Sequence, residues 1–174
     1  MKLEIELIPK SCSFSNVRSM LPKKHWDILR TKSYEKANHV CEVCGDTGKN
    51  QGYRHNVECH EIWEYDNKTN TQILRGLISL CPKCHQVKHF GRSSAIGKQA
   101  EVFKHMEIVN NWTHKECVTH VAQAMMEYRE RSKKKWSINL SVLHEIYEVP
   151  KKLITEAQKK QRVIKKPHWK SKKK

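Results

Sequence analysis

Two Cys-x-x-Cys pairs constrain this chain of 174 residues more than any other feature. The pairs are Cys41–Cys44 and Cys81–Cys84, and each places two thiols on one tight turn. Two such turns together supply the four sulfur ligands of a tetrahedral structural zinc site. The 36 residues between the pairs exceed the roughly 15–20 of a short zinc ribbon, so we expect an inserted structural element. Two redox-active or free dithiols are the alternative interpretation.

The composition also favours a fold that a metal ion stabilises. Hydrophobic residues make up 37% of the chain, below the ~45–50% that is typical of globular proteins. A large independent core is therefore not expected, and bound Zn²⁺ would supply folding free energy. Gly45 follows the first cysteine pair, where the turn often needs a positive φ.

The positive charge is concentrated towards the C-terminus. The formal net charge is +16, from 34 Lys and Arg against 18 Asp and Glu. Residues 129–174 hold 16 of these cations and 4 of these anions. Such a run suits contact with a phosphate backbone, and a solubilising tail or localisation signal is the alternative. The tail lysines that we predict to contact nucleic acid are Lys170, Lys172, Lys173 and Lys174.

Membrane and secretory segments are not expected. No stretch approaches the ~20 apolar residues that span a bilayer. No apolar segment follows a basic start either, since residues 1–10 alternate polar and apolar side chains. We therefore expect a cytoplasmic protein with no membrane partner.

The hydrophobic pattern predicts an ordered series of elements. The predicted strands cover 2–8, 57–63 and 73–80, and the predicted helices cover 23–39, 82–89, 95–110 and 114–134. The expected organisation is an N-terminal strand and lead-in helix over 1–40, a zinc-binding core over 41–92, a helical part over 93–149 and a basic tail over 150–174.

Three histidines accompany the cysteine pairs. His60 lies near the end of the first strand of the inserted hairpin, whereas His85 and His89 are four residues apart and share one face of a helix. A hairpin packed on this helix brings His60 close to His85. Such imidazoles can hold a second metal ion that stabilises a scissile phosphate. The nearest basic residues, which we predict to contact phosphates, are Arg75, Lys83, Lys88 and Arg92.

These segments resemble the ββα-metal, or HNH, nucleases. The matching segments are CEVCG at 41–45, VECHEIWEYD at 57–66 and GLISLCPKCHQVKH at 76–89, within a weaker similarity over about 11–145. The similarity is to a bacterial and phage subfamily with a zinc-ribbon frame. It implies a small α+β fold, in which a zinc-stabilised ββα-metal core has flanking helices and a basic C-terminal tail. It also implies a location in the bacterial cytoplasm, or in the host cytoplasm if a phage encodes the protein.

The resemblance implies an activity as well. It predicts a metal-dependent endonuclease that hydrolyses phosphodiester bonds in nucleic acid, with DNA preferred over RNA. The catalytic ion would be a divalent cation such as Mg²⁺, Mn²⁺ or Ni²⁺. His85 would be one of its ligands, and His89 a further ligand or a phosphate contact.

The resemblance leaves the role of His60 open. In one alignment His60 is a metal ligand and Glu61 is the general base. In the other, Cys59 is the ligand and His60 is the base. Gly76 stands where the family has an asparagine that braces the hairpin, although Asn67 or Asn70 could replace it.

Two further functions therefore stand beside the nuclease. One is a catalytically degenerate HNH-fold protein that binds DNA or RNA without cutting it. The other is an adaptor whose basic tail binds an acidic protein partner.

Overall fold

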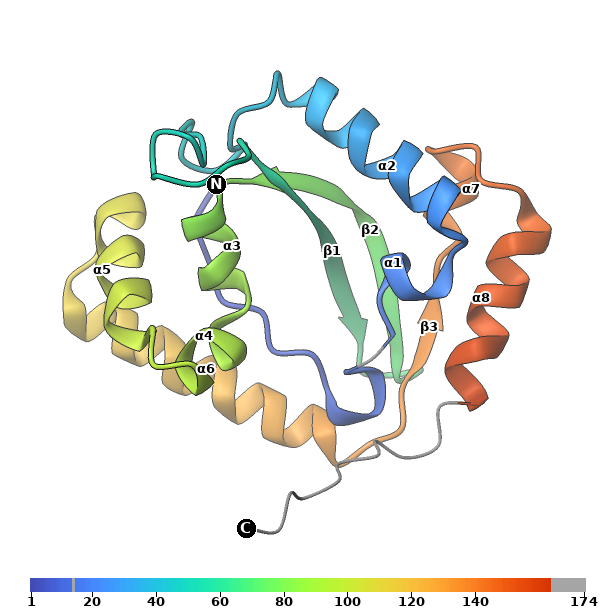
Figure 1. The fold of residues 1–174 in the computed structure, drawn as a ribbon. Helices are drawn as coiled ribbons and strands as arrows, with labels where there is room; N and C mark the ends of the chain where they lie inside the picture. The colour runs from blue at the N-terminus through green and yellow to red at the C-terminus, as the bar shows by residue number, and fades with distance from the viewer. Residues whose placement is uncertain (14, 164–174) are drawn as a thin grey trace, which may run out of the picture.

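The computed structural model describes residues 1–13 and 15–163. In this part of the chain, helices pack on both faces of a three-stranded sheet, so the protein is α+β (Figure 1). Strands β1 (Glu58–Asp66) and β2 (Thr71–Leu80) form an antiparallel hairpin, and β3 (Ser137–Asn139) pairs parallel with β2. The predicted hairpin is therefore confirmed, and β3 is an addition to it.

The helices follow the predicted order with some additions. Their bounds are α1 (Val17–Met20), α2 (Lys23–Lys36), α3 (Pro82–Lys88), α4 (Phe90–Ala95), α5 (Gln99–Asn110), α6 (His114–Ser132), α7 (Val142–Glu145) and α8 (Lys151–Val163), and a 3₁₀ turn covers Lys10–Cys12. The predictions of α2, α3, α5 and α6 are confirmed, whereas α1, α4 and α7 were not predicted. Thr113 and Glu116 form a capping box that begins α6.

The sheet separates two hydrophobic clusters. On one side, Leu74 and Leu77 of β2 pack with residues of α1, α2, α7 and α8. On the other side, Ile78 and Leu80 pack with the N-terminal segment, with α3 to α6 and with the cysteine pairs. Helix α3, which begins at the second cysteine pair, therefore packs against the β1–β2 hairpin.

The predicted strand over residues 2–8 is wrong. The Leu3 amide donates to Asn110 Oδ1 (2.7 Å), the Ile5 amide donates to His120 Nε2 (3.1 Å), and the Glu6 amide donates to the Lys88 carbonyl (3.0 Å). These partners belong to helices and their ends, so no strand ladder forms. The alternation that suggested a strand reflects the burial of Leu3 and Ile5 in an extended segment.

The segment predicted as a basic tail, over 150–174, includes a helix. Residues 151–163 form α8, which buries Ile154 and Ala157 in the first cluster. Lys160 Nζ donates to the Met20 carbonyl at 3.3 Å. The lysines at 170 and 172–174 lie outside the described residues.

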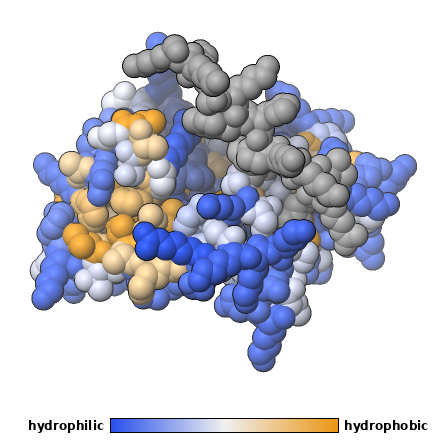
Figure 2. Space-filling view, turned by 90° about the horizontal axis from the view of Figure 1, so that it is seen from below, coloured by the Kyte–Doolittle hydropathy of each residue, from blue (hydrophilic) through white to orange (hydrophobic). Residues whose placement is uncertain are grey.

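One face of the molecule is seen in space-filling view in Figure 2. On the face seen in Figure 2, hydrophobic side chains gather towards one side and hydrophilic ones cover much of the rest. Within the described part of the chain, no helix combines the length and apolar character that a membrane crossing requires.

Gly48 provides a test of the loop between the first cysteine pair and β1. A Cβ at this position would lie 2.1 Å from the His55 carbonyl oxygen and 2.8 Å from Pro82 Cδ. We expect Gly48→Ala to lower the free energy of unfolding by about 1–3 kcal/mol, because the backbone must move to accept the methyl group. Urea denaturation measures this change.

Gly91→Ala is the matched control. Its Cβ would meet Leu7 Cδ2 at 3.5 Å, an ordinary contact, and Gly91 lies within α4. Since alanine favours a helix over glycine by up to ~1 kcal/mol, this variant should be neutral or more stable. Equal destabilisation by both substitutions would contradict the packing described for Gly48.

Candidate metal centres

The two cysteine pairs meet at one point. Cys44 Sγ lies 3.6 Å from Cys81 Sγ and 3.5 Å from Cys84 Sγ. Four sulfurs at ~2.3 Å from a zinc ion would be about 3.8 Å apart, so the spacing fits a tetrahedral site. Cys41 completes the group, and the four residues can hold a structural metal ion such as zinc.

Local hydrogen bonds shape both turns. Gly45 has a φ of +74°, as the sequence predicts, and its amide donates to the Cys41 carbonyl at 2.9 Å. At the second turn, the Cys84 amide and Gln51 Nε2 both donate to Cys81 Sγ, at 3.5 Å and 3.2 Å. The pKa of Cys41 is lowered to about 6, chiefly by its hydrogen bond with Cys44. Part of the cluster is therefore in the thiolate state that binds metals.

The three histidines form a second group beside the first. His85 and His89 project from α3 and the residue that follows it, and their Nε2 atoms are 3.0 Å apart. The ring of His60, on β1, lies 5.2 Å from that of His85 and 4.9 Å from that of His89, centroid to centroid. One ring nitrogen from each lies within 4.8 Å of the others, so this group can also hold a metal ion.

Two carboxylates orient these imidazoles. Glu58 Oε2 binds His85 Nδ1, and Glu6 Oε2 lies 3.1 Å from His60 Nε2. The nitrogens that remain are His85 Nε2 and His60 Nδ1. His60 is only 3% exposed, and its Nδ1 is buried with no hydrogen-bond partner among the described residues. Carboxylates that bind the second nitrogen of a histidine are characteristic of metal sites.

The protonation states suit the same interpretation. Burial lowers the pKa of His89 to about 3, so this imidazole is neutral at neutral pH. The pKa of Glu58 is lowered, chiefly by its hydrogen bond with His85. Burial opposes ionisation of Glu6, but the hydrogen bond and charge of His60, together with Lys88, hold its pKa below the usual value. Neutral imidazoles and ionised carboxylates are the forms that metal binding requires.

The structure does not bring Glu61 to the histidine group. Side chains alternate along β1, so Glu58 and His60 face α3 whereas Glu61 faces α1. Glu61 Oε1 accepts a hydrogen bond from the Val17 amide at 3.0 Å, and burial raises the pKa of this carboxyl. Glu61 is not one of the three residues that converge, and its role as general base stays a prediction. Cys59 also lies outside the group, because it packs against the other hydrophobic cluster.

The predicted phosphate contacts are dispersed. Arg75 is paired with Glu64 at 2.7 Å, and Lys88 Nζ with Glu6 Oε1 at 2.9 Å. Lys83 is exposed at the start of α3, and Arg92 is exposed on α4. Of these four, Arg92 shares a groove with His85. Glu6 and Glu58 were not among the predicted site residues.

Comparisons with known proteins do not place this chain in a family. No family model, no curated protein and no solved structure matches it. The interpretation of the site therefore depends on its own residues.

The four-cysteine site is tested by Cys84→Ser. We expect this variant to lose the bound ion and to unfold at much lower temperature, because structural zinc contributes on the order of 10 kcal/mol in small zinc domains. Metal analysis by mass spectrometry and thermal unfolding measure the two effects. Cys117→Ala, at a buried cysteine outside the cluster, should keep the ion. Loss of the ion from both variants would contradict the assignment.

The role of Glu6 is tested by Glu6→Gln. The amide cannot hold the His60 ring as a carboxylate does, so the affinity of the histidine group for added Co²⁺ or Ni²⁺ should fall by about 10–100-fold. Titration followed by the absorbance of the bound metal measures this change. Glu4→Gln removes an exposed carboxylate two residues away and should leave the affinity unchanged. Unchanged affinity in Glu6→Gln would exclude the orienting role.

Proposed function

We propose that this protein is a metal-dependent endonuclease of the HNH, or ββα-metal, type, which hydrolyses phosphodiester bonds in nucleic acid, preferably DNA. The observation that carries the proposal is the convergence of His60, His85 and His89 where the β1–β2 hairpin meets α3. The order of hairpin and helix, framed by two cysteine pairs, supports it.

The three histidines and the two carboxylates beside them have different roles in this proposal. We assign His85 and His89 as ligands of a divalent cation such as Mg²⁺, Mn²⁺ or Ni²⁺, and His60 as the third ligand through Nδ1. The two roles open to His60 are metal ligand and general base. A general base must reach the attacking water, so the 3% exposure of His60 favours the role of ligand. When bound, the cation stabilises negative charge on the scissile phosphate and the leaving oxygen. Glu6 and Glu58 keep the rings in the orientation that binding needs.

A second candidate function is binding of DNA or RNA without cleavage. The placement of Glu61 favours this function, because its carboxylate binds the Val17 amide of α1 instead of pointing towards the histidine group. Gly76 favours it too. The resemblance calls for an asparagine at this position, and glycine has no side chain that could brace the hairpin.

Digestion of supercoiled plasmid and of single-stranded RNA distinguishes the two functions. With Mg²⁺, Mn²⁺ or Ni²⁺ added in parallel, we expect cleavage by the wild-type protein. His60→Ala and His85→Ala should each reduce the rate by more than about 100-fold, because each removes a ligand rather than an orienting group. Zinc content should stay unchanged in both variants.

His114→Ala is the control, since His114 is exposed on α6 and binds Glu107 instead. It should cut as the wild type does. Equal cleavage by all four proteins would contradict the site assignment. Absence of cleavage with every metal, together with salt-sensitive binding to nucleic acid, would support the second function.

A further inference from the structure

A groove of about 820 Å³ opens beside the histidine group. Its walls come from α1, α2, the loop before β1, the start of β1, α3 and α4. His85 and Glu58 line it, so the groove leads directly to the exposed edge of the histidine group. His60 does not line it and is buried behind these residues.

The groove is positively charged. Four of its lining residues are arginine or lysine, and two are acidic. Both carboxylates are already engaged: Asp27 binds Lys23 and Arg30, and Glu58 binds His55 and His85. The acidic groups therefore offer little net repulsion to an anion that enters.

Arg18 and Arg92 differ from the other cations of the groove. Both are exposed, and within residues 1–13 and 15–163 neither forms an ion pair. Arg18 belongs to α1 and Arg92 to α4, so they approach the groove from elements that precede and follow the hairpin. An unpaired guanidinium presents several N–H donors in the fork geometry that binds phosphate oxygens.

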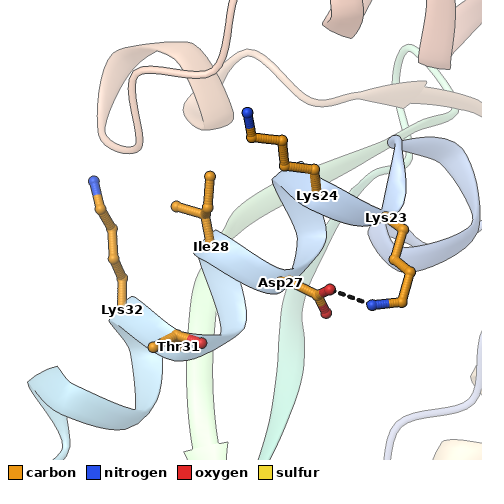
Figure 3. A pocket seen from close by; sticks show the side chains of 6 residues that line it. All are labelled: Lys23, Lys24, Asp27, Ile28, Thr31 and Lys32. Atoms are coloured by element: carbon orange, nitrogen blue, oxygen red, sulfur yellow. Dashed lines mark hydrogen bonds and ion pairs between the residues drawn. The ribbon is translucent and has the colours of Figure 1, made fainter.

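The outer face of α2 is a contrasting basic surface. Lys24, Ile28 and Lys32 project to one side of this helix, whereas the Lys23–Asp27 pair points to the other (Figure 3). The hollow along this outer face contains none of the three histidines. It therefore carries positive charge without access to the site.

We infer that the groove binds the phosphodiester backbone of a nucleic-acid strand, with Arg18 and Arg92 contacting phosphates on either side of the position that His85 faces. The inference rests on the proposed function for the chemistry of the ligand. Arg75 and Lys88, which the sequence suggested as phosphate contacts, are engaged by carboxylates. Arg18 takes their place in this proposal. The contacts with backbone phosphates carry no sequence preference of their own.

Fluorescence anisotropy with short labelled oligonucleotides tests this inference on the full-length, zinc-loaded protein. The probes are single-stranded DNA, duplex DNA and single-stranded RNA of several sequences, titrated at increasing salt. The double variant Arg18→Ala/Arg92→Ala should bind about tenfold more weakly, whatever the sequence. Its slope of log affinity against log salt should be smaller by about 1.4 on single strands or about 1.8 on duplex. The probe that the wild-type protein binds most tightly, and whose affinity falls most in this variant, identifies the preferred form of the ligand.

Lys24→Ala/Lys32→Ala removes the same charge from the outer face of α2 and is the matched control. It should retain the wild-type slope and nearly the wild-type affinity. Equal losses in both double variants, or no loss in Arg18→Ala/Arg92→Ala, would overturn the groove assignment. The residues of both pairs are exposed, so thermal unfolding should be unchanged.

The same samples, run on a denaturing gel with added divalent cation, report cleavage separately. Groove-dependent binding without cleavage would uphold the groove and reject the nuclease. Cleavage that is unaffected by the loss of Arg18 and Arg92 would uphold the nuclease and reject the groove.

Discussion

The sulfur atoms of four cysteines meet where the loop after α2 approaches the first turn of α3, and the hairpin lies between these two points in the chain. Because α3 begins at this junction, the directions of His85 and His89 are set by the same turn that places Cys81 and Cys84. The hairpin then has only to present His60 at the correct position of β1. A hydrophobic content of 37% is sufficient for such a fold, since the cysteine cluster itself forms part of the second core.

The histidine group and the groove depend on this junction in different ways. The rings are held from behind by Glu6 and Glu58, and burial keeps His89 neutral. The groove instead collects side chains from six parts of the chain, which approach one another only when both hydrophobic clusters have formed. The three histidines and Glu58 therefore come from β1, α3 and the residue after α3, whereas Glu6 and the groove depend on distant parts of the chain.

The sequence predicts the local parts of this architecture well and the long-range parts poorly. Spacing identifies the cysteine pairs, the helical pattern identifies α2 and α3, and the i, i+4 relation places His85 beside His89. Alternation misleads at residues 2–8, because any extended segment with one buried side shows it. Applied to β1, the same alternation places Glu61 on the opposite face of the strand from His60. No local sequence pattern predicts the role of Glu6, because its partner His60 is 54 residues away.

The contacts of the N-terminal segment have a consequence for biosynthesis. Leu3 is held by Asn110, and Ile5 by His120, so these residues are synthesised long before the partners that hold them. Until α5 and α6 have been made, the N-terminal segment lacks these two contacts, and Glu6 has its contacts with Lys88 and His60. Contacts that close loops of more than 100 residues form late in folding, since chain entropy opposes them. The nascent chain thus has both cysteine pairs and all three histidines well before the N-terminal segment has all of its contacts.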